Sequence, residues 1–202
     1  MTDPKLTDGE LEEKVRFLAE GVNVSGGGTN SDDLELQDVV NSKDEVIGTL
    51  PRGVIWDNSL QSNTRVTNVF VVDGEGKILL PVRSLKKRYL PGGYDFSCGE
   101  NLTAGESYET AVLRGLIEEL GVEDGNPKEV GVFSPDPEKN LFCFGKVYLL
   151  EVGDKSEIKI NNTDEIERLE WRTKEEILQM IDDEPEKFKR DYKAVFDLAF
   201  GS

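Results

Sequence analysis

The feature that most constrains the fold is a glycine-containing loop that leads into an acidic, amphipathic helix at positions 99–122 of this 202-residue chain. From position 107 to 120 the residues are mostly good helix formers, and Gly121 supplies a C-terminal stop. Apolar residues recur at helical spacing, which predicts one buried stripe. Its members are Leu113, Leu116, Ile117 and Leu120, with Val112 at the edge. Arg114, Gly115, Glu118 and Glu119 are then expected on the opposite face.

Charged residues on that opposite face suggest a chemical role. The four-residue step from Arg114 to Glu118 lets the guanidinium hold the carboxylate in position by charge-assisted hydrogen bonds. Glu118 and Glu119 project about 100° apart on the same helix. With Glu106 arriving from the loop, these carboxylates are expected to converge on a hard divalent cation, Mg²⁺ or Mn²⁺, which takes oxygen ligands. The alternative is a solvated acidic helix.

The same stretch resembles the Nudix box, written G-x5-E-x7-R-E-U-x-E-E-x-G-U with U apolar. Seven of its nine fixed positions match, namely Glu106, Arg114, Leu116, Glu118, Glu119, Gly121 and Val122. Two positions depart: Glu100 stands where the box has glycine, and Gly115 where it has the glutamate after the arginine. The resemblance implies metal-dependent attack of water on a nucleoside diphosphate linked to another group, with a small-molecule diphosphate as substrate.

The resemblance also implies roles for single residues. Glu118 and Glu119 would be metal ligands and catalytic carboxylates, Glu106 a further ligand or an outer-shell anchor, and Arg114 the residue that orients them. Gly115 offers no carboxylate, which would reduce the number of ions held or remove a base. Glu100 in the entry loop can restore one negative charge nearby.

A further carboxylate is the candidate general base. Glu165, in the segment TDEIERLEW, occupies a loop that supplies the base in some members of the family that the box resembles. The alternative for Glu165 is an exposed loop acid without a catalytic role.

A dense basic cluster precedes the box in a chain whose formal net charge is −17. It consists of Arg83, Lys86, Lys87 and Arg88. Cations just before a group of carboxylates suggest a substrate phosphate held beside a metal, and the alternative is a solvated loop. The negative charge of the whole chain argues against electrostatic binding of a nucleic acid polymer or an anionic membrane.

Residue usage narrows the chemistry and the compartment. The chain has no histidine, which excludes His-based serine or cysteine triads and His-ligated zinc, so carboxylates must carry any chemistry. The first residues lack the apolar segment of a secretory signal, and no apolar run approaches the roughly 20 residues that span a bilayer. A cytoplasmic protein is expected, with Cys98 and Cys143 as free thiols. A homodimer is left open.

The chain is expected to divide into residues 1–33, a short helix at 8–20 followed by a Gly/Ser-rich tether, and a domain at 34–202. Within the domain, strand pairs are predicted around the turns NSKD, DGEG and PDPEKN, with a helical segment after Pro51. A strand and a helix capped by Thr173 and Glu176 follow, and then a terminal helix at 182–200. This order predicts an α/β fold, and the resemblance implies a Nudix-type α/β/α sandwich with a mixed β-sheet.

Two alternatives to a hydrolase arise from departures in the sequence. The order of elements from Leu36 to Trp171 resembles the Nudix subgroup that contains type 1 isopentenyl diphosphate isomerases, and Cys98-Gly99 occupies the place of their reactive cysteine. Those isomerases also use histidines and a glutamate on the strand after the box, which this chain lacks, so half of the proton-transfer machinery is absent. The missing box glutamate suggests the other alternative, a Nudix-fold binding module without turnover.

Overall fold

A mixed six-stranded sheet is the middle layer of the computed structural model, which describes residues 6–21 and 31–201. The strand order is β6-β7-β3-β4-β8, and β5 pairs with β3 beside this path. The central β3 is parallel to β7, and the other pairs are antiparallel. The strands are β3 (Arg65–Asp73), β4 (Ile78–Arg83), β5 (Cys98–Asn101), β6 (Lys128–Phe133), β7 (Phe144–Val152) and β8 (Ile166–Arg172).

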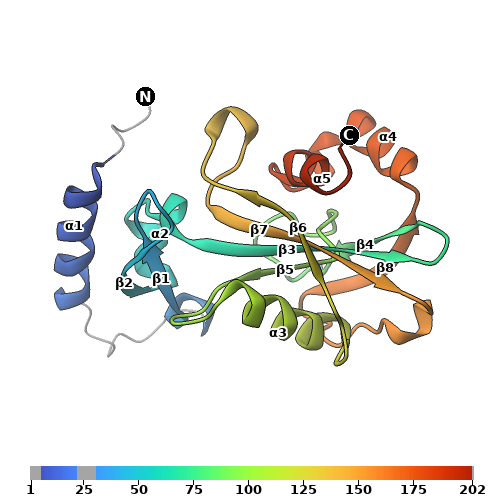
Figure 1. Cartoon of the computed structure of the whole chain (residues 1–202), viewed down its shortest axis with the longest axis horizontal. Coiled ribbons are helices and arrows are strands. Elements are labelled where there is room, and N and C mark those ends of the chain that lie inside the picture. Colours follow the sequence, from blue (N-terminus) through green and yellow to red (C-terminus); the bar gives the residue numbers. More distant parts are fainter. Residues whose placement is uncertain (1–5, 22–30, 202) are drawn as a thin grey trace.

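Helices cover both faces of this sheet, with α3 (Tyr108–Leu120) on one face and α4 (Lys174–Asp183) and α5 (Tyr192–Phe200) on the other (Figure 1). Alternating side chains of β3 explain the two layers, because successive residues of a strand point to opposite faces. Val69 and Val71 pack with the core under α3, whereas Phe70 packs edge-on against aromatic rings of α5. The predicted α/β sandwich with a mixed sheet is confirmed.

A smaller layer at the N-terminal side has its own apolar core. The hairpin β1 (Leu36–Val40) and β2 (Val46–Pro51) packs against α1 (Asp8–Gly21) and α2 (Arg52–Asp57). The sequence predicted each of these four elements but not the packing of α1 against the hairpin. Val15 of α1 lies so close to the hairpin that a Cβ on Gly48 would come within 2.5 Å of its Cγ1. The predicted tether lies largely at 22–30, outside the described residues, so the division at residue 33 stays a prediction.

The β1–β2 hairpin also forms hydrogen bonds with the loop that precedes α3. The carboxylate of Asp38, buried in β1, accepts hydrogen bonds from Arg65 Nη2 and from the backbone N–H of Gly105, both at 2.8 Å. The backbone N–H of Ala104 donates to the carbonyl of Leu36 at 2.9 Å. The N-terminal layer therefore fixes the position of the loop that carries the first box glutamate.

The predicted secondary structure was wrong in two places. The terminal helix begins at Tyr192 rather than at 182, because α4 runs to Asp183 and Pro185, which cannot continue a helix interior, opens a short 3₁₀ turn after it. The segment that was expected to be a loop before the box contains strand β5, which pairs with β3. The remaining 3₁₀ helices are Ser31–Leu34, Gln61–Asn63, Pro137–Lys139 and Lys155–Glu157. Across the described residues, no helix has the length and apolar character to cross a membrane.

Candidate active site

Helix α3 has the predicted ends but a different buried face. Ser107 accepts a hydrogen bond from the backbone N–H of Thr110, and Gly121 ends the helix in the left-handed conformation with φ 67°. Leu113 and Ile117, predicted to be buried, are each 42% exposed, and Gly115, predicted on the polar face, is buried. The prediction erred because α3 packs on β5 as well as on the core, and a single apolar stripe cannot show a second contact surface. Residues on the buried side are Tyr108, Ala111, Val112, Gly115, Leu116 and Leu120.

Arg114 contacts three carboxylates from three different segments. Its Nε and Nη2 donate to the two oxygens of Glu106 at 2.9 and 3.0 Å, and its Nη1 donates to Glu100 Oε2 at 2.9 Å. The predicted pair with Glu118 is the longest contact, at 3.4 Å. Arg114 therefore ties the entry loop and β5 to the helix through charge-assisted hydrogen bonds.

The carboxylate of Glu106 is buried and hydrogen-bonded rather than exposed to solvent. Its side chain is 7% exposed, and besides Arg114 it accepts from the backbone N–H of Thr103 at 2.9 Å. Burial alone would raise the pKa of Glu106, but the hydrogen bonds from Arg114 and Thr103 bring that pKa below its ordinary value. Of the two roles predicted for this residue, the geometry favours the outer-shell anchor.

Carboxylates gather where β5 meets the end of α3. One ligand atom each from Cys98, Glu100 and Glu119 lies within 4.8 Å of the others. Burial raises the pKa of Glu100 and raises that of Glu119 well above the ordinary value, and the charge of Glu165 raises both further. Half-buried acids that repel one another form a set of ligands whose charge a hard divalent cation neutralises, and the exposed Glu118 directly precedes Glu119 in α3. The oxygens therefore fit Mg²⁺ or Mn²⁺, whereas a thiol is a soft ligand.

The thiol of Cys98 is poorly suited to act as a thiolate. Its side chain is buried, and burial, followed by the charges of Glu119 and Glu100, raises the pKa of this thiol well above its usual range. The structure thus gives Cys98 a packing position between the sheet and α3.

The predicted basic cluster divides into residues with different surroundings. Arg83 is buried, donates to the Tyr89 carbonyl at 3.1 Å and is paired with the carboxylate of Asp95. Lys87 contacts the predicted base Glu165 at 2.6 Å, which brings two predicted site residues together. Lys86 is exposed and forms a pair with Asp164 at 2.7 Å, and Arg88 is exposed.

Sequence reasoning missed two charged residues at this site. Lys189, from the segment before α5, contacts Asp95 Oδ1 at 2.7 Å, and its Nζ lies 5.4 Å from the centre of the Phe96 ring. Burial would raise the pKa of Asp95, but Lys189 and Arg83 lower it below its usual value. Lys189 also opposes the rise in the pKa of Glu119. No local pattern could have indicated this lysine, because only the chain fold brings the C-terminal segment beside the box.

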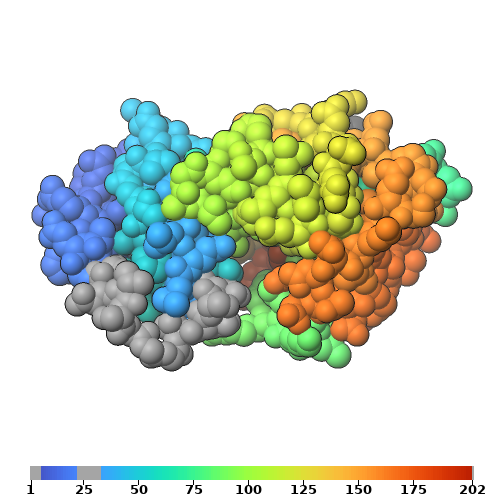
Figure 2. All heavy atoms as spheres, turned by 90° about the horizontal axis from the view of Figure 1, so that it is seen from below, coloured from blue at the N-terminus to red at the C-terminus, as the bar shows by residue number. Residues whose placement is uncertain are grey.

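These segments surround a hollow on one face of the molecule. Figure 2 shows it between the yellow-green α3 region, the green segment around residues 85–92 and the orange segment around residues 155–170. Those segments carry Glu118 and Glu119, the cations Lys86, Lys87 and Arg88, and Glu165. The face is therefore open to a small molecule with charged groups.

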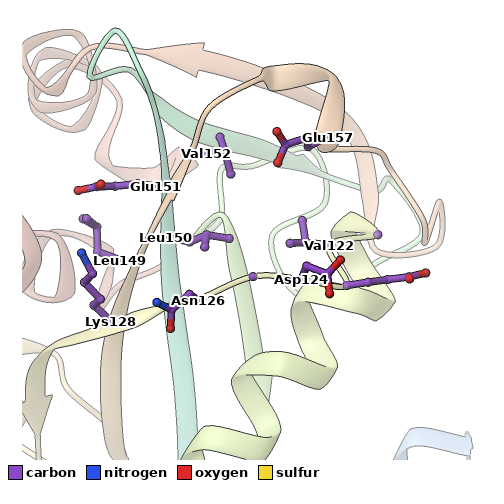
Figure 3. Close-up of a pocket in the computed structure, with 12 residues that line it drawn as sticks. Val122, Asp124, Asn126, Lys128, Leu149, Leu150, Glu151, Val152 and Glu157 are labelled. Carbon is purple, nitrogen blue, oxygen red and sulfur yellow. The ribbon is translucent and has the colours of Figure 1, made fainter.

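A separate hollow of about 650 Å³ lies just beyond the C-terminal end of α3, between the loop after that helix and β7 (Figure 3). Its lining includes the acidic residues Glu123, Asp124, Glu151 and Glu157 and the cation Lys128. This excess of negative charge disfavours a diphosphate, so the box hollow is the better candidate site.

Known proteins resemble this chain over most of its length. The family model described as the NUDIX domain matches residues 62–193. An uncharacterised Nudix hydrolase of Nostoc sp. is 37% identical over 151 residues, which cover 74% of this chain and 86% of the relative. A Nudix hydrolase of Deinococcus radiodurans is 34% identical over 77% of this chain and 86% of its own length.

Solved structures show the same fold. The crystal structure of DR0079 from Deinococcus radiodurans matches with a TM-score of 0.66 and 32% identity, covering 74% of this chain and 90% of that one. The NUDIX domain of Shewanella oneidensis NrtR, solved as a complex with ADP ribose, matches with a TM-score of 0.52 at 16% identity over 74% of this chain and 97% of that one. At 16% identity, the match to the NrtR domain shows a shared fold and nothing further.

Proposed function

The chain belongs to the Nudix hydrolase family, and on that premise we propose that it is a Mg²⁺- or Mn²⁺-dependent diphosphohydrolase acting on a nucleoside diphosphate derivative. The observation that carries the proposal is the gathering of Glu100 and Glu119 within ligand distance of one another, with Glu118 beside them. Such a group of acids is unfavourable without a cation and well suited to holding one.

The proposed chemistry assigns a task to each side chain. When bound, a divalent cation supplies Lewis-acid stabilisation of phosphoryl oxygens. Glu118 and Glu119 would hold that cation, and Arg114 positions Glu106 and Glu100 beside them through its hydrogen bonds. Glu165, whose carboxylate is held by Lys87 at 2.6 Å, accepts the proton of the attacking water.

The basic segment attracts the diphosphate in this proposal. Lys86 and Arg88 are exposed, and Lys87 is half-buried beside Glu165. Arg83, enclosed by Asp95 and the Tyr89 carbonyl, positions the segment rather than competing for phosphate. These cations would attract a small-molecule diphosphate to the site, and the carboxylates would hold the metal that acts on the bond to be cleaved.

A substrate panel tests the proposal. Purified protein is incubated with Mg²⁺ or Mn²⁺ and with nucleoside diphosphate sugars, ADP-ribose, dinucleotides, nucleoside triphosphates and isopentenyl diphosphate, and products are separated by anion-exchange chromatography. We expect metal-dependent cleavage of at least one nucleotide and its loss in EDTA. Tight binding of a nucleotide without any product would instead favour a binding module, and isomerised isopentenyl diphosphate would favour the isomerase.

A further inference from the structure

Glu100 and Gly115, the two residues that depart from the Nudix box, lie next to each other in the structure. A Cβ built on Gly115 of α3 would stand 2.3 Å from Cγ and 3.2 Å from Cδ of Glu100 on β5, and 2.8 Å from the sulfur of Cys98. Real Cβ atoms essentially never come within 3.0 Å of another heavy atom in this way. The side chain of Glu100 therefore occupies the volume that a side chain at position 115 would need.

This arrangement delivers a carboxylate to the helix from the neighbouring strand. The side chain of Glu100 is 17% exposed, and Arg114 Nη1 donates to its Oε2 at 2.9 Å. A carboxylate oxygen of Glu100 lies within 4.8 Å of one of Glu119. An acid held by the positioning arginine and adjacent to a second acid has the surroundings expected of a metal ligand.

We infer that the exchange of glycine and glutamate between positions 100 and 115 is compensating, and that Glu100 is a metal ligand in place of the absent box glutamate. The inference rests on the proposed function in that it concerns the same metal site. It explains why Gly115 is buried in an otherwise well-formed helix, where glycine costs about 1 kcal/mol relative to alanine: no other residue leaves room for Glu100.

Metal binding without substrate tests this inference. Mn²⁺ affinity is measured by electron paramagnetic resonance of the free ion for wild type, Glu100→Gln, Glu119→Gln, Glu100→Gly and the double variant Glu100→Gly/Gly115→Glu. Glu100→Gln keeps the size of the side chain and should weaken Mn²⁺ binding by roughly tenfold or more. The double variant returns the box to its conventional form and should bind Mn²⁺ nearly as tightly as wild type, whereas Glu100→Gly alone should not.

Glu109→Gln is the matched control. Glu109 is an exposed acid of the same helix, paired with Lys146 at 3.2 Å, and its neutralisation removes the same charge without touching the cluster. Its Mn²⁺ affinity should equal that of wild type. Circular dichroism and the thermal midpoint of each variant establish that the fold is intact.

Two results would overturn the inference. If Glu100→Gln binds Mn²⁺ as wild type does while Glu119→Gln does not, Glu100 is only a partner of Arg114 and the proposed hydrolase still stands. If the folded double variant binds no better than Glu100→Gly, the two positions do not substitute for each other. Loss of Mn²⁺ with Glu100→Gln in a protein that cleaves no member of the panel would support the inference and reject the proposed function.

Discussion

Replacing Arg114 by methionine should destabilise the fold through the carboxylates that it leaves behind. The guanidinium is 24% exposed, and it neutralises Glu106 and Glu100, which are 7% and 17% exposed. Removing one partner of a buried ion pair costs about 3–5 kcal/mol, and partial access of water to Arg114 places the expected loss near the lower limit, about 3 kcal/mol. For a chain of this size that corresponds to about 6–12 °C in the thermal midpoint.

Urea unfolding followed by circular dichroism in EDTA measures this loss without a contribution from metal. Arg168→Met is the control, because Arg168 is 57% exposed and its partner Glu170 keeps a second contact to Arg172 at 2.6 Å. The control should lose less than about 1 kcal/mol. Adding Glu106→Gln to Arg114→Met should recover part of the stability, since the buried charge is then removed. An Arg114 variant as stable as the Arg168 variant would refute the reasoning.

Three further variants have expected outcomes. Glu119→Gln should lower turnover by roughly 100-fold or more. It should also raise the metal-free thermal midpoint at pH 8. Burial raises the pKa of Glu119 in the folded state above its value in the unfolded state, so the wild-type protein loses stability as the pH rises from the unfolded pKa to the folded pKa. The stability gained by Glu119→Gln should therefore vanish near pH 4. A gain that does not depend on pH would contradict this explanation. Changing Lys86, Lys87 and Arg88 together to alanine should raise KM and make activity less sensitive to salt, and an unaltered KM would leave the segment as solvated surface. Cys98→Ser should change the hydrolysis rate by less than about tenfold, and a larger loss with intact folding would mean that the thiol takes part in the chemistry.

Local patterns in the sequence predicted the elements that have local causes. The capping box of Thr173 and Glu176 is present, with the Thr173 N–H donating to Glu176 at 2.8 Å. Gly121 ends α3, and DGEG joins β3 to β4. Each depends on neighbours within a few residues, which a sequence shows directly. The box spacing likewise pointed to Arg114, which donates hydrogen bonds to Glu106 and Glu100 in the structure.

Features that depend on contacts between distant segments could not be predicted in the same way. The buried position of Gly115 follows from β5 approaching α3, and β5 itself was expected as a loop. Lys189 reaches Asp95 only because the segment before α5 returns to the sheet. Glu100 was recognised as a nearby charge, but the volume it takes at position 115 became visible only in three dimensions.

Hydrolysis in water enriched in ¹⁸O tests the central claim most directly. A nucleotide cleaved by the wild-type protein with Mg²⁺ is analysed by mass spectrometry of its phosphate-containing products. We predict one ¹⁸O atom in a single phosphoryl product per bond cleaved, roughly 100-fold less labelled product in the same time with Glu119→Gln, and none in EDTA. A product formed without label, or label incorporated equally by the Glu119 variant, would contradict metal- and carboxylate-dependent hydrolysis of a diphosphate.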